Sequence, residues 1–168
     1  MENEFAFKQL GEFVVKFQVI ENQIRELIMY IISENEDFIE ILITDLEFTN
    51  RIKKCDIVFS RFCNIHPGPD ERSQKSFHDL MNSILKAAER RNELVHSNYY
   101  TWQNIHGETG LLRQNFKNKA SKGAVEMQEE EILPKDLLSD IANLDNISER
   151  IEEFRLQVVD WRSNARFD

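Results

Sequence analysis

Four long stretches of this chain carry apolar residues at steps of three and four positions, the spacing that places side chains on one face of an α-helix. The first stretch runs from about Glu4 to Ser33, with apolar positions at Leu10, Phe13, Val14, Phe17, Ile20, Ile24, Leu27, Ile28 and Ile31. The others lie at about Leu46 to Cys63, at Phe77 to Ala88 and at Leu137 to Trp161. Each apolar face needs a partner that shields it from water, so the sequence predicts a mainly helical fold.

The connections favour an antiparallel four-helix bundle. The run Pro67-Gly68-Pro69 cannot continue a helix, and Pro134 suits the first turn of the last helix. Between the third and fourth long helices, aromatic and β-branched residues flank a glycine-bearing turn, which predicts a small β-hairpin insertion at about residues 99–128. The polar segment 118–131 is either a short third strand with a loop or a partly mobile stretch. Residues 38–43 form either a short helix or a buried connector.

The composition is typical of one soluble domain. The chain has 168 residues, of which 41% are hydrophobic and 30% charged. Cys55 and Cys63 stand eight positions apart on one predicted helix, which suits neither a disulfide nor a zinc site. No apolar run approaches membrane-spanning length, and the first residues are acidic, unlike those of a signal peptide. We therefore expect residues 1–168 to form a single cytoplasmic domain with no membrane segment, metal or cofactor.

The third predicted helix ends in polar residues that could act on a phosphodiester. Arg91 follows Ala88 on the apolar face, and Asn92 and His96 lie one helical turn apart. The guanidinium is a permanently charged donor that matches phosphate oxygens, and imidazole exchanges protons near neutral pH. His96 could act as general base or acid while Arg91 stabilises charge on the phosphoryl oxygens and Asn92 orients either group. This set predicts metal-independent RNA cleavage by attack of the ribose 2′-hydroxyl.

Helix geometry separates two of these side chains. At ~100° per residue, five steps place His96 ~140° around the helix axis from Arg91. Either the last turn unwinds near His96, or two copies pair so that each contributes to a shared cleft. We favour the dimer.

The arrangement Arg91-Asn92-x-x-x-His96, near the end of the third long helix of a small helical chain, resembles the signature of the HEPN superfamily. The resemblance implies a HEPN-like domain over the whole chain, with Arg91, Asn92 and His96 at the catalytic positions. It also implies a metal-independent endoribonuclease with a composite active site in a homodimer. Such proteins act as toxins, in antiviral defence against phage, or with CRISPR systems.

One position departs from a subset of that superfamily. Some of its toxins have a tyrosine two residues after the histidine, which a partner nucleotidyltransferase modifies, whereas this chain has Asn98 there. A nucleotidyltransferase antitoxin is therefore not expected, although another neutralising protein remains a possible partner. The stretch Tyr99-Tyr100-Thr101-Trp102 and the hairpin after it look more like HEPN branches with a β insertion before the last helix.

Charge and aromatic residues gather near the proposed site. The chain has a net charge of -9, which argues against a general nucleic-acid binder, but residues 86–122 hold seven basic and three acidic residues. An aromatic face accepts any base, so aromatics here could stack on RNA. The predicted RNA-binding residues are Arg90, Tyr99, Tyr100, Trp102, Arg113 and Lys117. The alternatives are a chance cluster on a solvated hairpin and aromatics that cover the helical core.

A second function from another class also fits. The chain could be a non-catalytic HEPN-like module that binds a nucleotide, RNA or a protein, with Arg91 and Asn92 holding the helices together through buried hydrogen bonds. Exposure of His96 separates the two hypotheses, because catalysis needs an accessible imidazole near a second Arg91. A binding module would tolerate His96 in an ion pair with Glu89 or Glu93.

Overall fold

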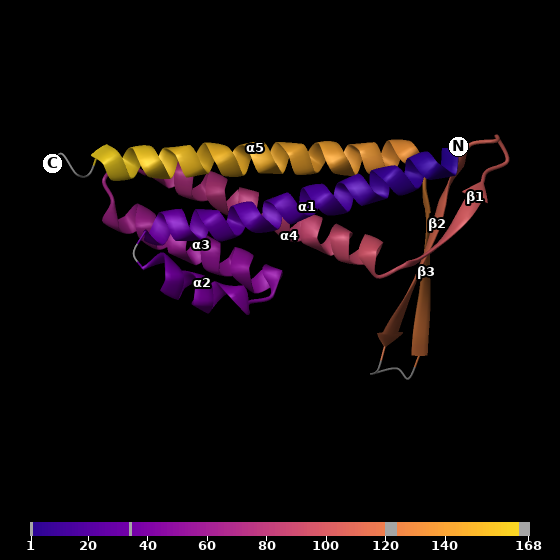
Figure 1. Ribbon diagram of the computed structural model, residues 1–168, viewed down its shortest axis with the longest axis horizontal. Coiled ribbons are helices and arrows are strands. Elements are labelled where there is room, and N and C mark those ends of the chain that lie inside the picture. The colour runs from indigo at the N-terminus through magenta and orange to yellow at the C-terminus, as the bar shows by residue number, and fades with distance from the viewer. Residues whose placement is uncertain (1, 34, 120–123, 165–168) are drawn as a thin grey trace. The chain divides into compact units, whose positions relative to one another are not determined.

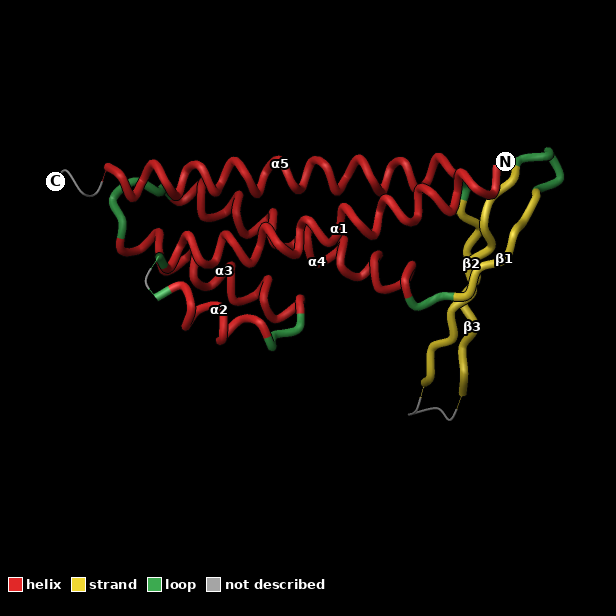
Figure 2. Tube along the Cα trace, in the orientation of Figure 1, coloured by secondary structure: helices red, strands yellow, loops and turns green. Residues whose placement is uncertain are grey.

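The computed structural model describes residues 2–33, 35–119 and 124–164 (Figures 1 and 2). Within them the chain is mainly helical, with a small antiparallel sheet between the last two helices. The elements in order are α1 (Glu2–Ile32), α2 (Glu36–Thr44), α3 (Phe48–Ile65), α4 (Glu71–Val95), β1 (Asn98–Gln103), β2 (Thr109–Lys119), β3 (Ala124–Ile132) and α5 (Pro134–Asn164). None of the described helices is long and apolar enough to cross a membrane.

Two compact units divide the chain. One contains the residues up to Phe17 together with Glu89–Leu144, and the other contains Gln18–Ala88 together with the chain from Asp145 onward. Helices α1, α4 and α5 each contribute residues to both units. We call the first the sheet unit and the second the helical unit, and we describe each by itself.

Aromatic rings form the centre of the helical unit. Phe59 of α3 stacks on Phe77 of α4 with ring centroids 3.8 Å apart, and Phe154 of α5 meets Phe77 edge-on at 5.0 Å. The sequence predicts Phe48, Ile52, Cys55, Phe59 and Phe62 on the inner side of α3, and all but the partly exposed Phe48 are buried. On α1, Ile20, Ile24, Leu27, Ile28 and Ile31 are buried, whereas Leu10 and Val14 of the predicted stripe are partly exposed. These helical periods are confirmed because each apolar face found a shielding partner.

The connection into α4 has its own local determinants. The carboxylate Oδ1 of Asp70 accepts hydrogen bonds of 2.7 Å from both the backbone N–H and the hydroxyl of Ser73, so Asp70 caps the N-terminus of α4. These bonds hold the pKa of Asp70 below its usual value. Gly68 lies against the indole ring of Trp161, where a Cβ atom would come within 2.2 Å of the ring. The segment that the sequence left open at 38–43 is part of α2.

The insertion is a three-stranded sheet in the order β1-β2-β3. Strands β1 and β2 form the predicted hairpin, and β3 adds a third strand to it. Tyr99 pairs with Arg113, and Arg113 pairs with Glu130 on the next strand. The third strand, left open by the sequence, extends to Ile132, beyond the predicted limit of residue 128. Leu111 and Ile132 are buried and pair with each other, which anchors this end of the sheet.

Candidate functional site

Helix α4 ends at Val95, immediately before His96. The backbone N–H of His96 still donates to the carbonyl of Asn92, at 3.1 Å, so the chain keeps its helical course for one more residue. Asn92 and His96 therefore lie one turn apart, and both side chains are exposed. Among the described residues, the His96 imidazole has no hydrogen bond or ion pair, which leaves both ring nitrogens accessible.

Arg91 lies to one side of this pair and is half-buried. Its guanidinium carbon is 5.9 Å from the centroid of the Phe17 ring, within the range of a cation–π contact. Its Nη1 donates to Oδ1 of Asn92 at 3.1 Å. The amide of Asn92 thus contacts the guanidinium and lies one turn from the imidazole, while Arg91 and His96 stay apart around the helix, as expected.

A hollow of about 430 Å³ contains Asn92 and His96 but not Arg91. Its other lining residues are Glu89, Glu93 and Asn115. The sequence named Glu89 and Glu93 only as possible ion-pair partners of His96, and it did not point to Asn115. The spacing of Glu89, Asn92, Glu93 and His96 at steps of three and four could have revealed the shared helical face, whereas Asn115 comes from β2 and is placed only by the fold of the sheet.

Two carboxylates make the hollow of one copy acidic. Glu89 is exposed, and Glu93 is partly exposed, with its Oε2 3.9 Å from Arg90 and 4.0 Å from Arg113. Glu89 and Glu93 would repel a phosphate placed beside His96. The described lining of a single hollow therefore presents two amides, two carboxylates and an imidazole to a ligand, but no guanidinium.

Arg90 and Arg113, predicted to bind RNA, instead join the sheet to the helices. Arg113 has only 5% of its surface exposed, and its Nε lies 2.8 Å from Glu130 Oε2. Arg90 donates to the same Glu130 oxygen at 2.9 Å and to Asp140 of α5 at 2.9 Å. Burial opposes the charged form of Glu130, but the hydrogen bond from Arg90 and the two guanidinium charges outweigh it and lower the pKa of Glu130.

The strand alternation separates the predicted aromatic surface into two faces. Tyr99 faces the helices, where its hydroxyl donates to the carbonyl of Leu94 at 2.6 Å and burial raises its pKa to about 12. We therefore correct its assignment as a base-stacking residue. Tyr100 is exposed and Trp102 is half-buried, and both lie on the opposite face of the sheet.

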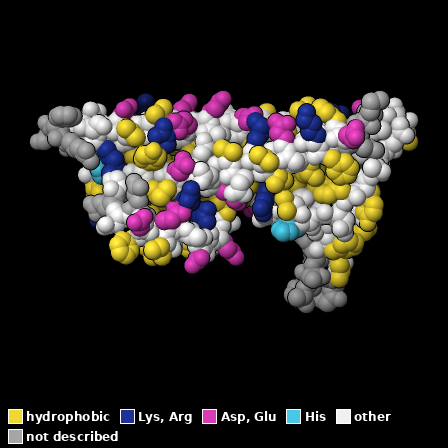
Figure 3. Space-filling view, viewed as in Figure 1, with side chains coloured by type: hydrophobic (Ala, Val, Ile, Leu, Met, Phe, Trp, Pro, Cys, Tyr) yellow, Lys and Arg dark blue, Asp and Glu magenta, His cyan; other side chains and the backbone are white. Residues whose placement is uncertain are grey.

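That outer face carries further apolar side chains, seen as the hydrophobic surface over the strands in Figure 3. Phe116 and Met127 pair across β2 and β3, and both are more than half exposed. Lys117, the remaining predicted RNA-binding residue, pairs with Glu126 through its backbone, but its side chain lies outside the described part of the chain.

Searched against protein-family models, curated proteins and solved structures, the chain matched none. The site is therefore interpreted from its own residues. Its geometry offers an accessible imidazole, an amide one turn away and a nearby guanidinium at the C-terminal end of α4.

Proposed function

We propose that the chain is a metal-independent endoribonuclease of HEPN type that acts in the cytoplasm as a toxin or phage-defence effector. The observation that carries the proposal is the exposed pair of Asn92 and His96 at the C-terminal end of α4, with Arg91 hydrogen-bonded to the Asn92 amide. The finer fold that accompanies it is an antiparallel four-helix bundle of α1, α3, α4 and α5.

The chemistry needs one proton acceptor and one proton donor. The imidazole of one His96 removes the proton of a ribose 2′-hydroxyl, and the oxygen attacks the adjacent phosphorus. The P–O5′ bond breaks, and a protonated imidazole returns a proton to the leaving 5′-oxygen. The products are a 2′,3′-cyclic phosphate end and a 5′-hydroxyl end. A guanidinium stabilises the charge that develops on the non-bridging oxygens.

A homodimer supplies what one copy lacks. One imidazole cannot be base and acid in the same step, and the described lining of the hollow in a single copy contains no guanidinium for the phosphate. A second copy would bring a second His96, and its own Arg91, to a shared cleft. Tyr100, Trp102 and Lys117 remain proposed RNA contacts, and a neutralising protein is a possible further partner.

The test is incubation of a mixed RNA pool with the protein in excess chelator. We expect cleavage to 2′,3′-cyclic phosphate ends by the wild type, and a loss of about 10²- to 10⁴-fold in rate for His96→Ala. His106→Ala is the matched control, because His106 is an exposed histidine in the turn between β1 and β2 and should cleave like the wild type. Light scattering should report a dimer for all three.

A second function is favoured by the surroundings of Arg91. Its half-buried guanidinium contacts Phe17 and Asn92, and two glutamates line the hollow, as a non-catalytic HEPN-like binding module would allow. In that case folded, dimeric wild type would leave the RNA pool intact. His96→Ala would then change the binding of a nucleotide, RNA or protein rather than a cleavage rate.

A further inference from the structure

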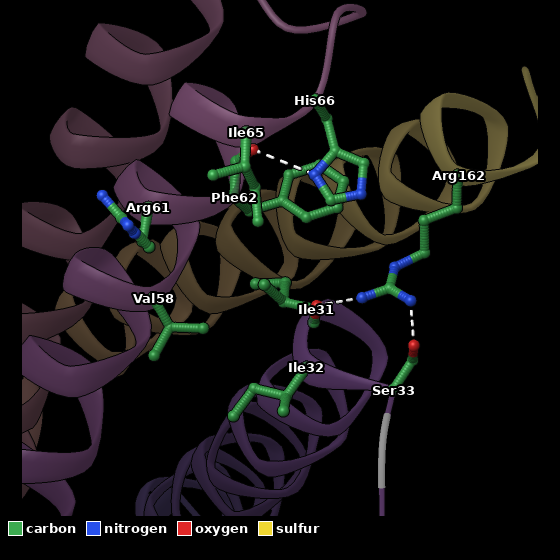
Figure 4. Close-up of a pocket in the computed structure, with 9 residues that line it drawn as sticks. All are labelled: Ile31, Ile32, Ser33, Val58, Arg61, Phe62, Ile65, His66 and Arg162. Carbon is green, nitrogen blue, oxygen red and sulfur yellow. Dashed lines mark hydrogen bonds between the residues drawn. The ribbon is translucent and has the colours of Figure 1, made fainter. Parts of the chain in front are cut away.

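A second hollow lies in the helical unit, far along the sequence from the proposed RNA site. It has a volume of about 370 Å³, within the range of small-molecule pockets, about 300–1,000 Å³. Its apolar walls come from the end of α1, through Ile31 and Ile32, and from α3, through Val58, Phe62 and Ile65. Figure 4 shows these side chains together with the polar groups of the pocket.

The ionisable groups of this pocket are all basic. Arg61, His66 and Arg162 line it, and no acidic side chain is among its described lining residues. The whole chain carries a net charge of -9, so a hollow whose ionisable groups are all basic differs from the acidic chain around it. Charge complementarity therefore indicates an anionic ligand.

Two of these basic groups are held in place by the protein. The Arg162 guanidinium donates to the carbonyl of Ile31 and the hydroxyl of Ser33, and its central carbon lies 5.5 Å from the Phe62 ring centroid (Figure 4). His66 stacks on Phe62 with ring centroids 3.9 Å apart and an angle of 21° between planes. Groups fixed before binding lose less entropy when a ligand arrives.

The tautomer of His66 follows from its partner. Its Nδ1 lies 3.1 Å from the carbonyl oxygen of Phe62, and because a carbonyl only accepts, Nδ1 carries the proton. Nε2 is then left for a ligand or solvent. Arg61 is exposed, and in Figure 4 its guanidinium points away from Arg162, so its side chain would turn to meet an anion in the pocket.

We propose that this pocket binds a small organic anion, with one carboxylate or phosphate group on a flat apolar body. The anionic group pairs with Arg61 and Arg162, since guanidinium donors match both oxyanions. The flat body lies against the apolar wall and the aromatic shelf of Phe62 and His66. This inference is independent of RNA cleavage.

Trp161 provides the signal for a test, because its ring lies 6.3 Å from that of Phe62. We would remove the other tryptophan with Trp102→Phe and titrate the full chain with benzoate, with adenosine 5′-monophosphate, with adenosine and with inorganic phosphate. A saturable change in the fluorescence of Trp161 with either organic anion supports the proposal. The anion that binds more tightly shows whether the ligand carries a carboxylate or a phosphate. Adenosine and inorganic phosphate should each bind at least about tenfold more weakly, since each lacks one half of the ligand.

Two further variants in the same background assign the signal to the pocket. Arg61→Gln should weaken binding about tenfold, while Lys53→Gln, an exposed basic residue on the same helix, should leave it unchanged. Circular dichroism checks that each variant folds. Equal affinities for the two variants, adenosine binding as tightly as its monophosphate, or no saturable response to either organic anion at millimolar concentration would overturn the proposal.

Discussion

Removing Arg113 should destabilise the protein through the charge that it leaves behind. The side chain is buried against Glu130, and its Nη1 also donates to the carbonyl of Glu93 at 3.1 Å. Loss of one partner of a buried ion pair typically costs about 3–5 kcal/mol. Glu130 keeps Arg90 at 2.9 Å, and a third of its side chain is exposed, so we expect about 2–3 kcal/mol for Arg113→Met after solvent screening is allowed for.

A double-mutant cycle with Glu130→Gln separates this electrostatic cost from lost packing. If the unpaired carboxylate is the main cost, the double variant should be little less stable than either single variant, with a coupling energy of about 1–3 kcal/mol. Urea unfolding measures all four proteins, and an unchanged m-value shows that the same surface is exposed on unfolding.

The control cycle uses Arg155→Met and Glu152→Gln. These residues form an ion pair of 2.6 Å on α5 and are far more exposed, so their coupling should stay below about 1 kcal/mol. Additive losses at Arg113 and Glu130, within about 0.5 kcal/mol, would refute the view that the buried network joins the sheet to the helices.

Two other predictions concern polar groups in the sheet unit. The lowered pKa of Glu130 in the folded protein adds stability above its unfolded pKa of about 4.3, and this stability is lost as the pH falls through the lower folded value. The difference in unfolding free energy between wild type and Glu130→Gln should therefore hold from about pH 7 to 5 and close below about pH 4. A difference that acid leaves unchanged would contradict this sign. Gln9 is 2% exposed, and neither its Nε2 nor its Oε1 has a hydrogen-bond partner among the described residues. Replacing it in Gln9→Met should therefore raise the free energy of unfolding by about 1–3 kcal/mol. If urea unfolding shows a less stable variant instead, the amide is hydrogen-bonded in the folded protein.

The helices could be predicted from sequence because their determinants are local. The stripe from Leu10 to Ile31 repeats every three to four residues, and the helix that contains it ends at Ile32. The cap by Asp70 depends only on a residue three positions away. In such segments one pattern fixes both the element and the face that it buries.

The sheet shows where that reasoning stops. Tyr99 and Tyr100 are neighbours of similar chemistry, and alternation alone says that they face opposite sides without saying which side is inward. Arg113 and Glu130 lie on strands whose registration sets their contact, so a charged residue such as Arg113 could not be identified as buried from its surroundings in sequence. The inward face of β3 is also largely polar, so apolar periodicity could not identify this strand from the sequence.

The site was predictable in part. The common helix turn of Asn92 and His96 follows from their spacing, and the structure places both at the end of α4. The contribution of Asn115 depends on how β2 returns past that end. The contact of Arg91 with Phe17 joins residues distant in sequence, so no local pattern could have revealed it.

The two cysteines, Cys55 and Cys63, can report how often the helical unit opens. Cys55 is fully buried, whereas Cys63 is only partly buried, and neither forms a disulfide. Burial raises the pKa of both thiols, that of Cys63 to about 11 and that of Cys55 further, so a thiol reagent meets little thiolate in the closed protein. Small local fluctuations should be enough for a thiol reagent to reach Cys63, whereas Cys55 should react only when α3 separates from its neighbours. The ratio of the two labelling rates would thus report how often the core opens, under native conditions and without a denaturant.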